Sequence, residues 1–383
     1  MKKVKMLFKL VILCFLSLTL FSSCEKAGTE LKDLMIIQGI GIDKEKDEFK
    51  VTVEILNNEQ SGSPGGDSNS ENKTKIYSAS GKSVSVALRE LSSKSGNLPL
   101  FAHNRVIILS EDVAKENLEN LLDFFVRNYD SRASQIICVV KGDKAESVIR
   151  AKLLKDTIKS EILENLLEES YNQSLVPRAR VVDVINALNN ETGAFCIPAI
   201  EIDKNGENED YKLSGCALLD KTGILEFLDS SEAEGISFLT DSVKNGFLET
   251  ELADGVKAEF LINKSKTKYK ISNINGEIYY DLSVDIVCDL DEIERSNIPE
   301  SDAQLVRELK EAVQKTVVKK SQKTLSALQS QDGGDAVMYY KRLELQDSDS
   351  YNKLKGDWKN IFPKIRTRMK VDVTIRRIGE ETF

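Results

Sequence analysis

The sequence predicts an α+β fold of two to three small domains, each a mostly antiparallel or mixed sheet flanked by helices. Three patterns support this prediction. Residues 49–55 alternate apolar and polar side chains, which is typical of a half-buried strand. Residues 118–125 place Leu118, Leu121, Leu122 and Phe125 on one face of a helix. Residues 280–290 alternate over a greater length, which indicates an antiparallel sheet with one face in water.

The first 23 residues have the features of a signal peptide. Lys2, Lys3 and Lys5 precede an uncharged, mostly apolar stretch from Leu10 to Phe21. A basic start followed by a short apolar core is typical of export signals. The core is too short for a spanning helix, which needs about 20 apolar residues. We therefore expect residues 1–23 to be removed, so that the mature chain begins at residue 24.

The end of the apolar core, Phe21-Ser22-Ser23-Cys24, resembles a bacterial lipobox. In such a sequence the peptide is cut after the small residue, here Ser23, and the cysteine thiol, here Cys24, takes a diacylglyceryl group. Two acyl chains anchor a protein stably to a bilayer, whereas a single chain binds only marginally. We expect a lipoprotein that is attached to a membrane through diacylglyceryl and palmitate chains on Cys24. An ordinary cleaved signal with an incidental cysteine is the alternative.

Charge and composition exclude several classes of function. The 383 residues carry 53 Lys+Arg against 62 Asp+Glu, a net charge of −9, and one histidine, His103. An acidic balance argues against non-specific nucleic-acid binding, and one histidine cannot build a His-rich metal site. Cys138, Cys196, Cys216 and Cys288 lie far apart without a Cys-x-x-Cys pair, which argues against zinc. Their strand-like surroundings favour buried free thiols, although export would permit disulfides. We expect no metal and no other cofactor.

Residues 24–205 are expected to form an N-terminal α+β region, with a division into subdomains at about 30–150 and 151–205 as one option. Residues 57–73 are rich in Ser, Gly and Asn and are expected to form a loop. The remaining periodicity predicts strands at 34–37, 49–55, 74–79, 105–109 and 135–140 and helices at 83–91, 118–125, 144–151, 158–169 and 179–188.

The segment Gly39-Ile40-Gly41-Ile42-Asp43 falls between two expected strands. Its two glycines are similar to the start of a dinucleotide-binding loop. That loop needs a third glycine and a helix after it, and here a strand follows. The segment therefore predicts a glycine-assisted hairpin or bulge.

Residues 206–383 are expected to form a C-terminal α+β domain, because the polar stretch 203–210 is the best candidate for a boundary. Pro299, Ser301 and Gln304 predict a helix start of the capping-box type, with the helix continuing to about Ser330. The other expected elements are strands at 212–219, 223–228, 247–252, 257–262, 268–274, 277–290 and 368–378 and short helices at 334–343 and 349–358.

The sequence contains no motif that indicates catalysis. It has no Gly-x-x-x-x-Gly-Lys phosphate loop, no Gly-x-Ser-x-Gly elbow and no His-Glu-x-x-His. His103 precedes an expected strand, and no serine or cysteine motif points to it, so a structural or surface role is expected. We expect that the protein is not an enzyme and assign no catalytic residue.

Several segments in order resemble the Ger(x)C family, the lipoprotein C subunits of spore nutrient germinant receptors. The resemblance covers nearly the whole mature chain. Residues 31–43 are similar to the family's opening strand and Gly-Ile-Asp turn. The other similar segments are 103–110 with the helix end at 125–128, 213–225, 232–235, 358–363 and 371–379. This chain departs from the family at Glu25-Lys26-Ala27-Gly28, where a tryptophan is common, and in an expanded loop at 57–73.

The resemblance implies a non-enzymatic receptor subunit, lipid-anchored on the outer face of the spore inner membrane. Its implied partners are the integral membrane A and B subunits of the receptor. The complex would sense a small-molecule germinant, although this subunit need not bind it. On this reading Gly39, Gly41, Asp43 and Arg127 are candidates for a structural or partner-contact motif.

Two other functions are compatible with an exported chain. A solute-binding lipoprotein of a membrane transporter would usually fold as two α/β lobes, whereas residues 212–290 indicate a strand meander. An exported enzyme would have to use His103 or buried carboxylates.

Overall fold

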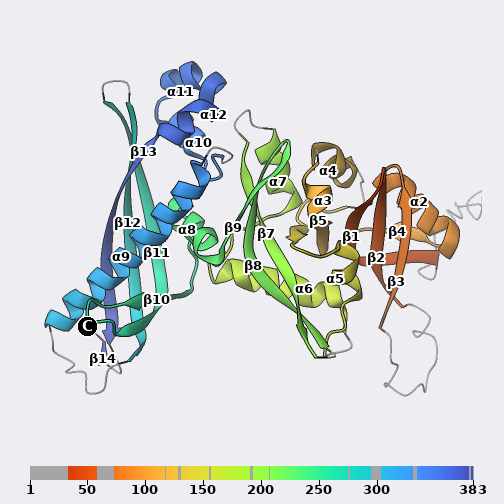
Figure 1. Cartoon of the computed structure of the whole chain (residues 1–383), viewed down its shortest axis with the longest axis horizontal. Coiled ribbons are helices and arrows are strands. Elements are labelled where there is room, and N and C mark those ends of the chain that lie inside the picture. The colour runs from red at the N-terminus through yellow and green to blue at the C-terminus, as the bar shows by residue number, and fades with distance from the viewer. Residues whose placement is uncertain are drawn as a thin grey trace, which may run out of the picture.

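The computed structural model describes residues 33–57, 73–116, 118–127, 131–154, 157–189, 193–206, 208–274, 277–294, 303–330, 334–378 and 381–382. These residues form two sheets with their own helices, one after the other along the long axis of the molecule (Figure 1). Ser23, Cys24, most of the 57–73 loop and the expected cap at Ser301 lie outside the described residues. The α+β prediction is confirmed, because mixed sheets are flanked by helices in two domains.

The first sheet has nine strands in the order β3-β2-β1-β5-β6-β7-β8-β9, with β4 beside one end of β1. β1 pairs antiparallel with β2 but parallel with β5, and β5, β6 and β7 continue in parallel. The strands are β1 (Leu34–Glu45), β2 (Glu48–Leu56), β3 (Thr74–Gly81), β4 (Leu98–Leu100), β5 (Val106–Ser110), β6 (Ile136–Val140), β7 (Phe195–Asn205), β8 (Asn208–Asp220) and β9 (Gly223–Leu228).

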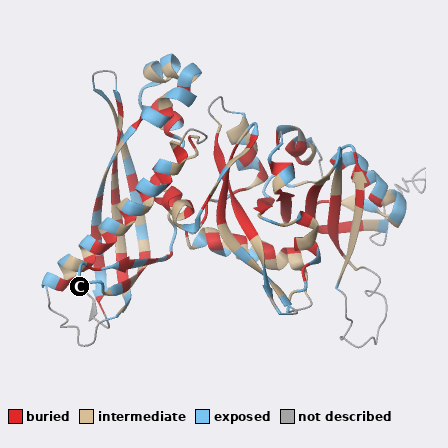
Figure 2. Ribbon diagram, viewed as in Figure 1, coloured by how far each residue is buried: buried red, intermediate tan, exposed pale blue. Residues whose placement is uncertain are grey.

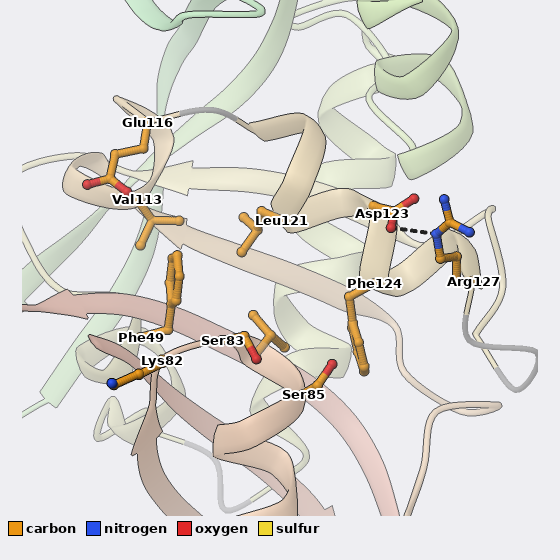
Figure 3. Close-up of a pocket in the computed structure, with 11 residues that line it drawn as sticks. Phe49, Lys82, Ser83, Ser85, Val113, Glu116, Leu121, Asp123, Phe124 and Arg127 are labelled. Carbon is orange, nitrogen blue, oxygen red and sulfur yellow. Dashed lines mark hydrogen bonds and ion pairs between the residues drawn. The ribbon is translucent and has the colours of Figure 1, made fainter. Parts of the chain in front are cut away.

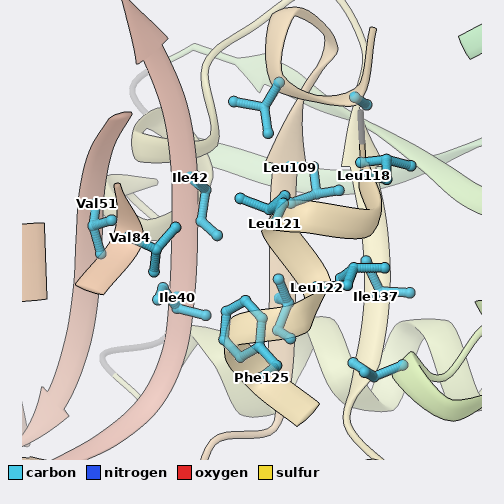
Figure 4. Close-up of a cluster of buried hydrophobic side chains, with 14 of the residues drawn as sticks. Ile40, Ile42, Val51, Val84, Leu109, Leu118, Leu121, Leu122, Phe125 and Ile137 are labelled. Carbon is cyan, nitrogen blue, oxygen red and sulfur yellow. The ribbon is translucent and has the colours of Figure 1, made fainter. Parts of the chain in front are cut away.

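Helices cover both faces of this sheet. They are α2 (Val84–Ser95), α3 (Glu111–Ala114), α4 (Leu118–Arg127), α5 (Ala145–Arg150), α6 (Lys159–Asn172) and α7 (Val181–Leu188). α2, α3, α4 and α7 enclose one core with the strands, and the expected stripe of Leu118, Leu121, Leu122 and Phe125 is buried in it (Figure 4). α5 and α6 enclose a separate core on the opposite face. The buried residues accordingly follow the central strands and the inner sides of the helices (Figure 2).

The second sheet has the order β10-β11-β12-β13-β14 and is joined to the first through α8 (Ser230–Thr240). Its strands are β10 (Phe247–Glu251), β11 (Lys257–Ile274), β12 (Glu277–Ile293), β13 (Arg366–Ile378) and β14 (Glu381–Thr382). The long helix α9 (Ala303–Leu328) crosses its apolar face (Figure 1). α10 (Tyr339–Gln346), α11 (Ser348–Leu354), η3 (Lys355–Asp357), α12 (Trp358–Ile361) and η4 (Phe362–Lys364) then lead to β13.

The structure differs from the expected elements at several places. β1 runs straight through the two glycines, and the turn lies later, at residues 46–47; a register shift between Ile37 and Gly39 provides the irregularity that the glycines indicated. Residues 257–274 form one strand instead of two. β13 pairs parallel with β12, because the helical connection returns the chain to the same end of the sheet. The expected boundary at 205/206 falls at the hairpin turn between β7 and β8, which pair in one sheet, so the division into domains stays a prediction.

Candidate functional site

Asp43 lies at the end of β1 and holds the start of a helix that is distant in sequence. Its side chain is 1% exposed, and its two carboxylate oxygens accept the backbone N–H groups of Ala145 and Glu146, both at 2.8 Å. The residue that precedes α5, Lys144, makes no side-chain cap. Asp43 therefore supplies the N-terminal cap of α5 from another element. Burial raises the pKa of Asp43, and the two backbone hydrogen bonds oppose that rise.

The glycines of β1 allow two helix starts to lie directly against the strand. Gly39, Gly41 and Asp43 alternate along β1 and so share one face of the sheet. A Cβ atom on Gly39 would lie 2.0 Å from the Oγ of Ser160 in α6. A Cβ atom on Gly41 would lie 2.9 Å from the carbonyl oxygen of Ala145. Both distances are shorter than any allowed contact, so these positions need glycine because the helices approach closely.

Glu54 of β2 has the same role toward α6. It is fully buried and accepts hydrogen bonds from the N–H groups of Lys159 and Ser160, at 2.9 and 2.8 Å, and from the Ser160 hydroxyl at 2.6 Å. The alternation in β2 indicated that this polar face lies in water, and that expectation is wrong for Thr52 and Glu54, which are both 0% exposed. Helix starts cover the face and satisfy the carboxylate. No signal in the sequence distinguishes Thr52 and Glu54 from Lys50, which alternates with the apolar residues of β2 in the same way.

These buried carboxylates are fully engaged with hydrogen-bond donors. A carboxylate that already accepts two or three N–H or O–H groups stabilises a local structure and is poorly placed to accept a proton from a substrate. Gly39, Gly41 and Asp43 thus dock α5 and α6 on the sheet. Of the two roles expected for this motif, structural or partner contact, its geometry supports the structural one.

Arg127 lies elsewhere, at the rim of a pocket of about 660 Å³ on the opposite face of the sheet (Figure 3). Phe49, Leu121 and Phe124 provide apolar walls, and α2 begins at the edge of the pocket. The Arg127 side chain is 78% exposed, and its Nε donates to Asp123 at 2.6 Å. The structure therefore does not bring Arg127 together with the motif on β1.

The other reactive residues have environments that suit structural roles. His103 is exposed in the turn before β5. Cys138, Cys196, Cys216 and Cys288 are buried and free, as their strand-like surroundings indicated, and burial raises the pKa of the Cys138 thiol far above its ordinary value. Among the described residues, no three His, Cys, Asp or Glu side chains are placed to hold a metal ion. No helix in the described part of the chain combines the length and apolar character that crossing a bilayer requires.

Two family models match the chain in order. Residues 28–202 match the spore germination protein N-terminal domain, and residues 214–379 match the spore germination B3/GerAC-like C-terminal domain. The chain belongs to the Ger(x)C family. It is therefore a spore germination protein of the kind that forms the C subunit of germinant receptors. The segment that carries Gly39, Gly41 and Asp43 lies within the N-terminal match.

Relatives and a solved structure agree with this membership of the Ger(x)C family. The chain is 26% identical to spore germination protein KC of Bacillus subtilis (strain 168), over 97% of this chain and 95% of that protein. It is 25% identical to spore germination protein B3 of the same organism, over 91% and 92%. The crystal structure of the GerBC protein superposes with a TM-score of 0.59 at 23% identity, covering 90% of this chain and 99% of that one. This likeness shows that the two chains share a fold.

Proposed function

We propose that this Ger(x)C protein is a lipoprotein that is anchored through Cys24 to the outer face of the spore inner membrane. The observation that carries the proposal is that both family models match in order, directly after a lipobox-like sequence. Leu34, the first residue of β1, lies ten positions after Cys24 (34 − 24). A chain spans at most about 3.5 Å per residue, so the anchor keeps the start of β1 within about 35 Å of the bilayer.

The proposed partners are the integral membrane A and B subunits of a germinant receptor. A lipid anchor confines the protein to the plane of the bilayer and raises its effective concentration for such partners. In this arrangement the protein positions its partners through contacts, and this role needs no catalytic group. The buried carboxylates described above cap helices, as is expected in a protein with a structural role. The complex senses a small-molecule germinant and triggers germination.

The function is tested by replacing the anchor residue in spores. Cys24→Ala should release the protein from the membrane fraction and abolish nutrient-triggered germination. Cys14→Ala is the matched control, because it removes a thiol from the same segment and leaves the lipobox intact. Normal germination by Cys24→Ala spores whose protein is in the soluble fraction would refute the proposal.

The fold gives less support to a solute-binding lipoprotein. Such proteins close two similar α/β lobes around a ligand, whereas the second sheet here joins three antiparallel strands, β10 to β12, to a parallel strand covered by one long helix. A purification of the detergent-solubilised protein discriminates the two: receptor A and B subunits should be recovered with it, and a transporter in their place would favour the alternative.

A further inference from the structure

β13 has an open edge at the outer side of the second sheet (Figure 1). On one side β13 pairs with β12 along residues 366–378. On the other side only Arg377 and Ile378 are paired, with the two-residue strand β14. Within the described chain, no strand pairs with residues 366–376 on that side. The backbone carbonyl of Val371, within this stretch, accepts a hydrogen bond from the Nε2–H group of Gln314 in α9 at 3.0 Å.

The face of the second sheet away from α9 carries columns of alternating charge. β11 contributes Lys264, Lys266, Lys268 and Lys270 at every second position, and all four are exposed. β12 contributes Asp281 and Asp285, and β13 contributes Arg366, Arg368 and Lys370, followed on the same face by Asp372. Asp281 lies directly between Lys270 and Arg368 in the register of the sheet. At this level of the sheet the sign therefore changes from basic to acidic to basic across the three strands. Asp285 lies opposite Asp372, where the basic stretch of β13 ends.

Hydrogen bonds and ion pairs connect these columns of charged side chains across the sheet. Arg368 forms a two-pronged hydrogen bond with Asp281. Lys268 reaches Asp285 at 2.9 Å, and Arg366 reaches Glu277 at 3.3 Å. Arg366 and Arg368 have acidic neighbours on the β12 side, and Lys370 pairs with Asp372 of its own strand. The three basic side chains remain 55–73% exposed.

We propose that the open edge of β13 accepts an extended segment of a partner protein as an added strand, with acidic residues at alternate positions. Main-chain hydrogen bonds to a free strand edge provide affinity in this mode of binding, and the side-chain pattern provides selectivity. Opposite charges on adjacent strands stabilise a pair by about 0.2–1 kcal/mol, and like charges disfavour it. A second copy of β13 fits less well, because alignment of the basic stretches would place like charges opposite each other.

The test uses the full-length chain in detergent and two nine-residue peptides that alternate Val with Glu or Val with Lys. Hydrogen exchange of the β13 amides and fluorescence anisotropy of the labelled peptides are measured. The Glu peptide should bind and slow exchange in residues 366–376, and the Lys peptide should not. Lys370→Glu should lower the affinity for the Glu peptide by about two- to fivefold, which corresponds to one lost cross-strand pair. Arg368→Glu with Lys370→Glu should reverse the preference.

Lys264→Glu is the matched control, because Lys264 lies on the same face but two strands from the open edge, and it should leave peptide binding unchanged. Lys370→Glu keeps the experiment informative if the double variant does not fold, since Lys370 contacts only Asp372 of its own strand among the described ion pairs. The proposal is wrong if neither peptide binds, if both bind equally, or if the protected amides lie outside β13. Protection of β13 by vesicles of anionic lipid, with none by the Glu peptide, would instead assign the edge to the membrane surface.

Discussion

The carboxylate of Asp43 accepts a 2.8 Å hydrogen bond from the backbone N–H of Ala145, 102 residues further along the chain. This contact links the end of β1 to the start of α5, a helix that has no cap of its own. Gly41 lies two residues before Asp43 and allows Ala145 to approach the strand. The family-like motif of β1 is thereby explained as the place where the sheet receives its helices.

Asp43→Ala should destabilise the protein by roughly 2–4 kcal/mol, because it removes a helix cap and leaves two buried N–H groups without acceptors. Asp43→Asn should cost less, since the amide oxygen can still accept one of the two hydrogen bonds. Urea unfolding gives the free energies, and faster hydrogen exchange should be centred on α5. Asp47→Ala, in the exposed turn after β1, is the control and should change stability by less than about 0.5 kcal/mol. Equal stability of Asp43→Ala and Asp47→Ala would contradict the capping role.

Gly39→Ala should destabilise by about 1–3 kcal/mol, since its methyl group would overlap Ser160. Ser160→Gly removes both atoms of Ser160 that the methyl group meets, so the double variant should be more stable than the sum of the two single changes predicts. A double-mutant cycle by urea unfolding should give a coupling of about 0.5–3 kcal/mol. Gly356→Ala, where a Cβ atom meets nothing within 4 Å, serves as the control. Strict additivity of Gly39→Ala and Ser160→Gly would show that the two positions do not press on each other.

Asp335, between α9 and α10, should make the stability of the protein depend on pH. Its buried carboxylate accepts the N–H groups of Tyr339 and Tyr340, at 2.9 and 2.8 Å, and the indole N–H of Trp358 at 3.0 Å. Burial nevertheless raises the pKa of Asp335 to about 6 from its ordinary value of 3.8. Because the folded-state pKa is the higher one, its contribution to stability is fully present below about pH 4 and is lost as the pH rises through 6.

The free energy of unfolding of the wild-type protein, relative to Asp335→Asn, should therefore fall by roughly 3 kcal/mol between pH 4 and pH 6.5. Both proteins are unfolded in urea at each pH, and the difference is plotted. Asp357→Asn, which changes an exposed carboxylate nearby, should follow the wild type throughout. A difference between wild type and Asp335→Asn that stays constant with pH would contradict the raised pKa.

Local patterns were sufficient to predict the elements whose surroundings are simple. The apolar stripe of α4 and the alternation in β12 identify a helix and a strand because one side of each faces a core. The alternation of β2 places Glu54 on the polar face, but that face is buried because the start of α6, more than 100 residues away, covers it. The parallel pairing of β13 likewise depends on a helical connection of about 70 residues, and no short-range pattern encodes it. Sequence periodicity indicated the elements, and contacts between distant segments decided which polar faces are buried.

Arg127→Ala should leave stability within about 0.5 kcal/mol of the wild type, because an exposed ion pair within one helix contributes little. Because Arg127 is a candidate for contact with a receptor subunit, the same change should slow nutrient-triggered germination and lower recovery of that subunit in a purification. Lys94→Ala, on an exposed part of α2, should alter neither property. A fully active Arg127→Ala receptor would remove Arg127 from the contact surface.

The anchor at Cys24 is tested most directly by mass spectrometry of the N-terminal peptide of the protein isolated from spore membranes. The account predicts that Cys24 is the first residue and that its peptide carries the added mass of a diacylglyceryl group. An N-terminal peptide that begins elsewhere, or that contains Cys24 with an unmodified thiol, would contradict it.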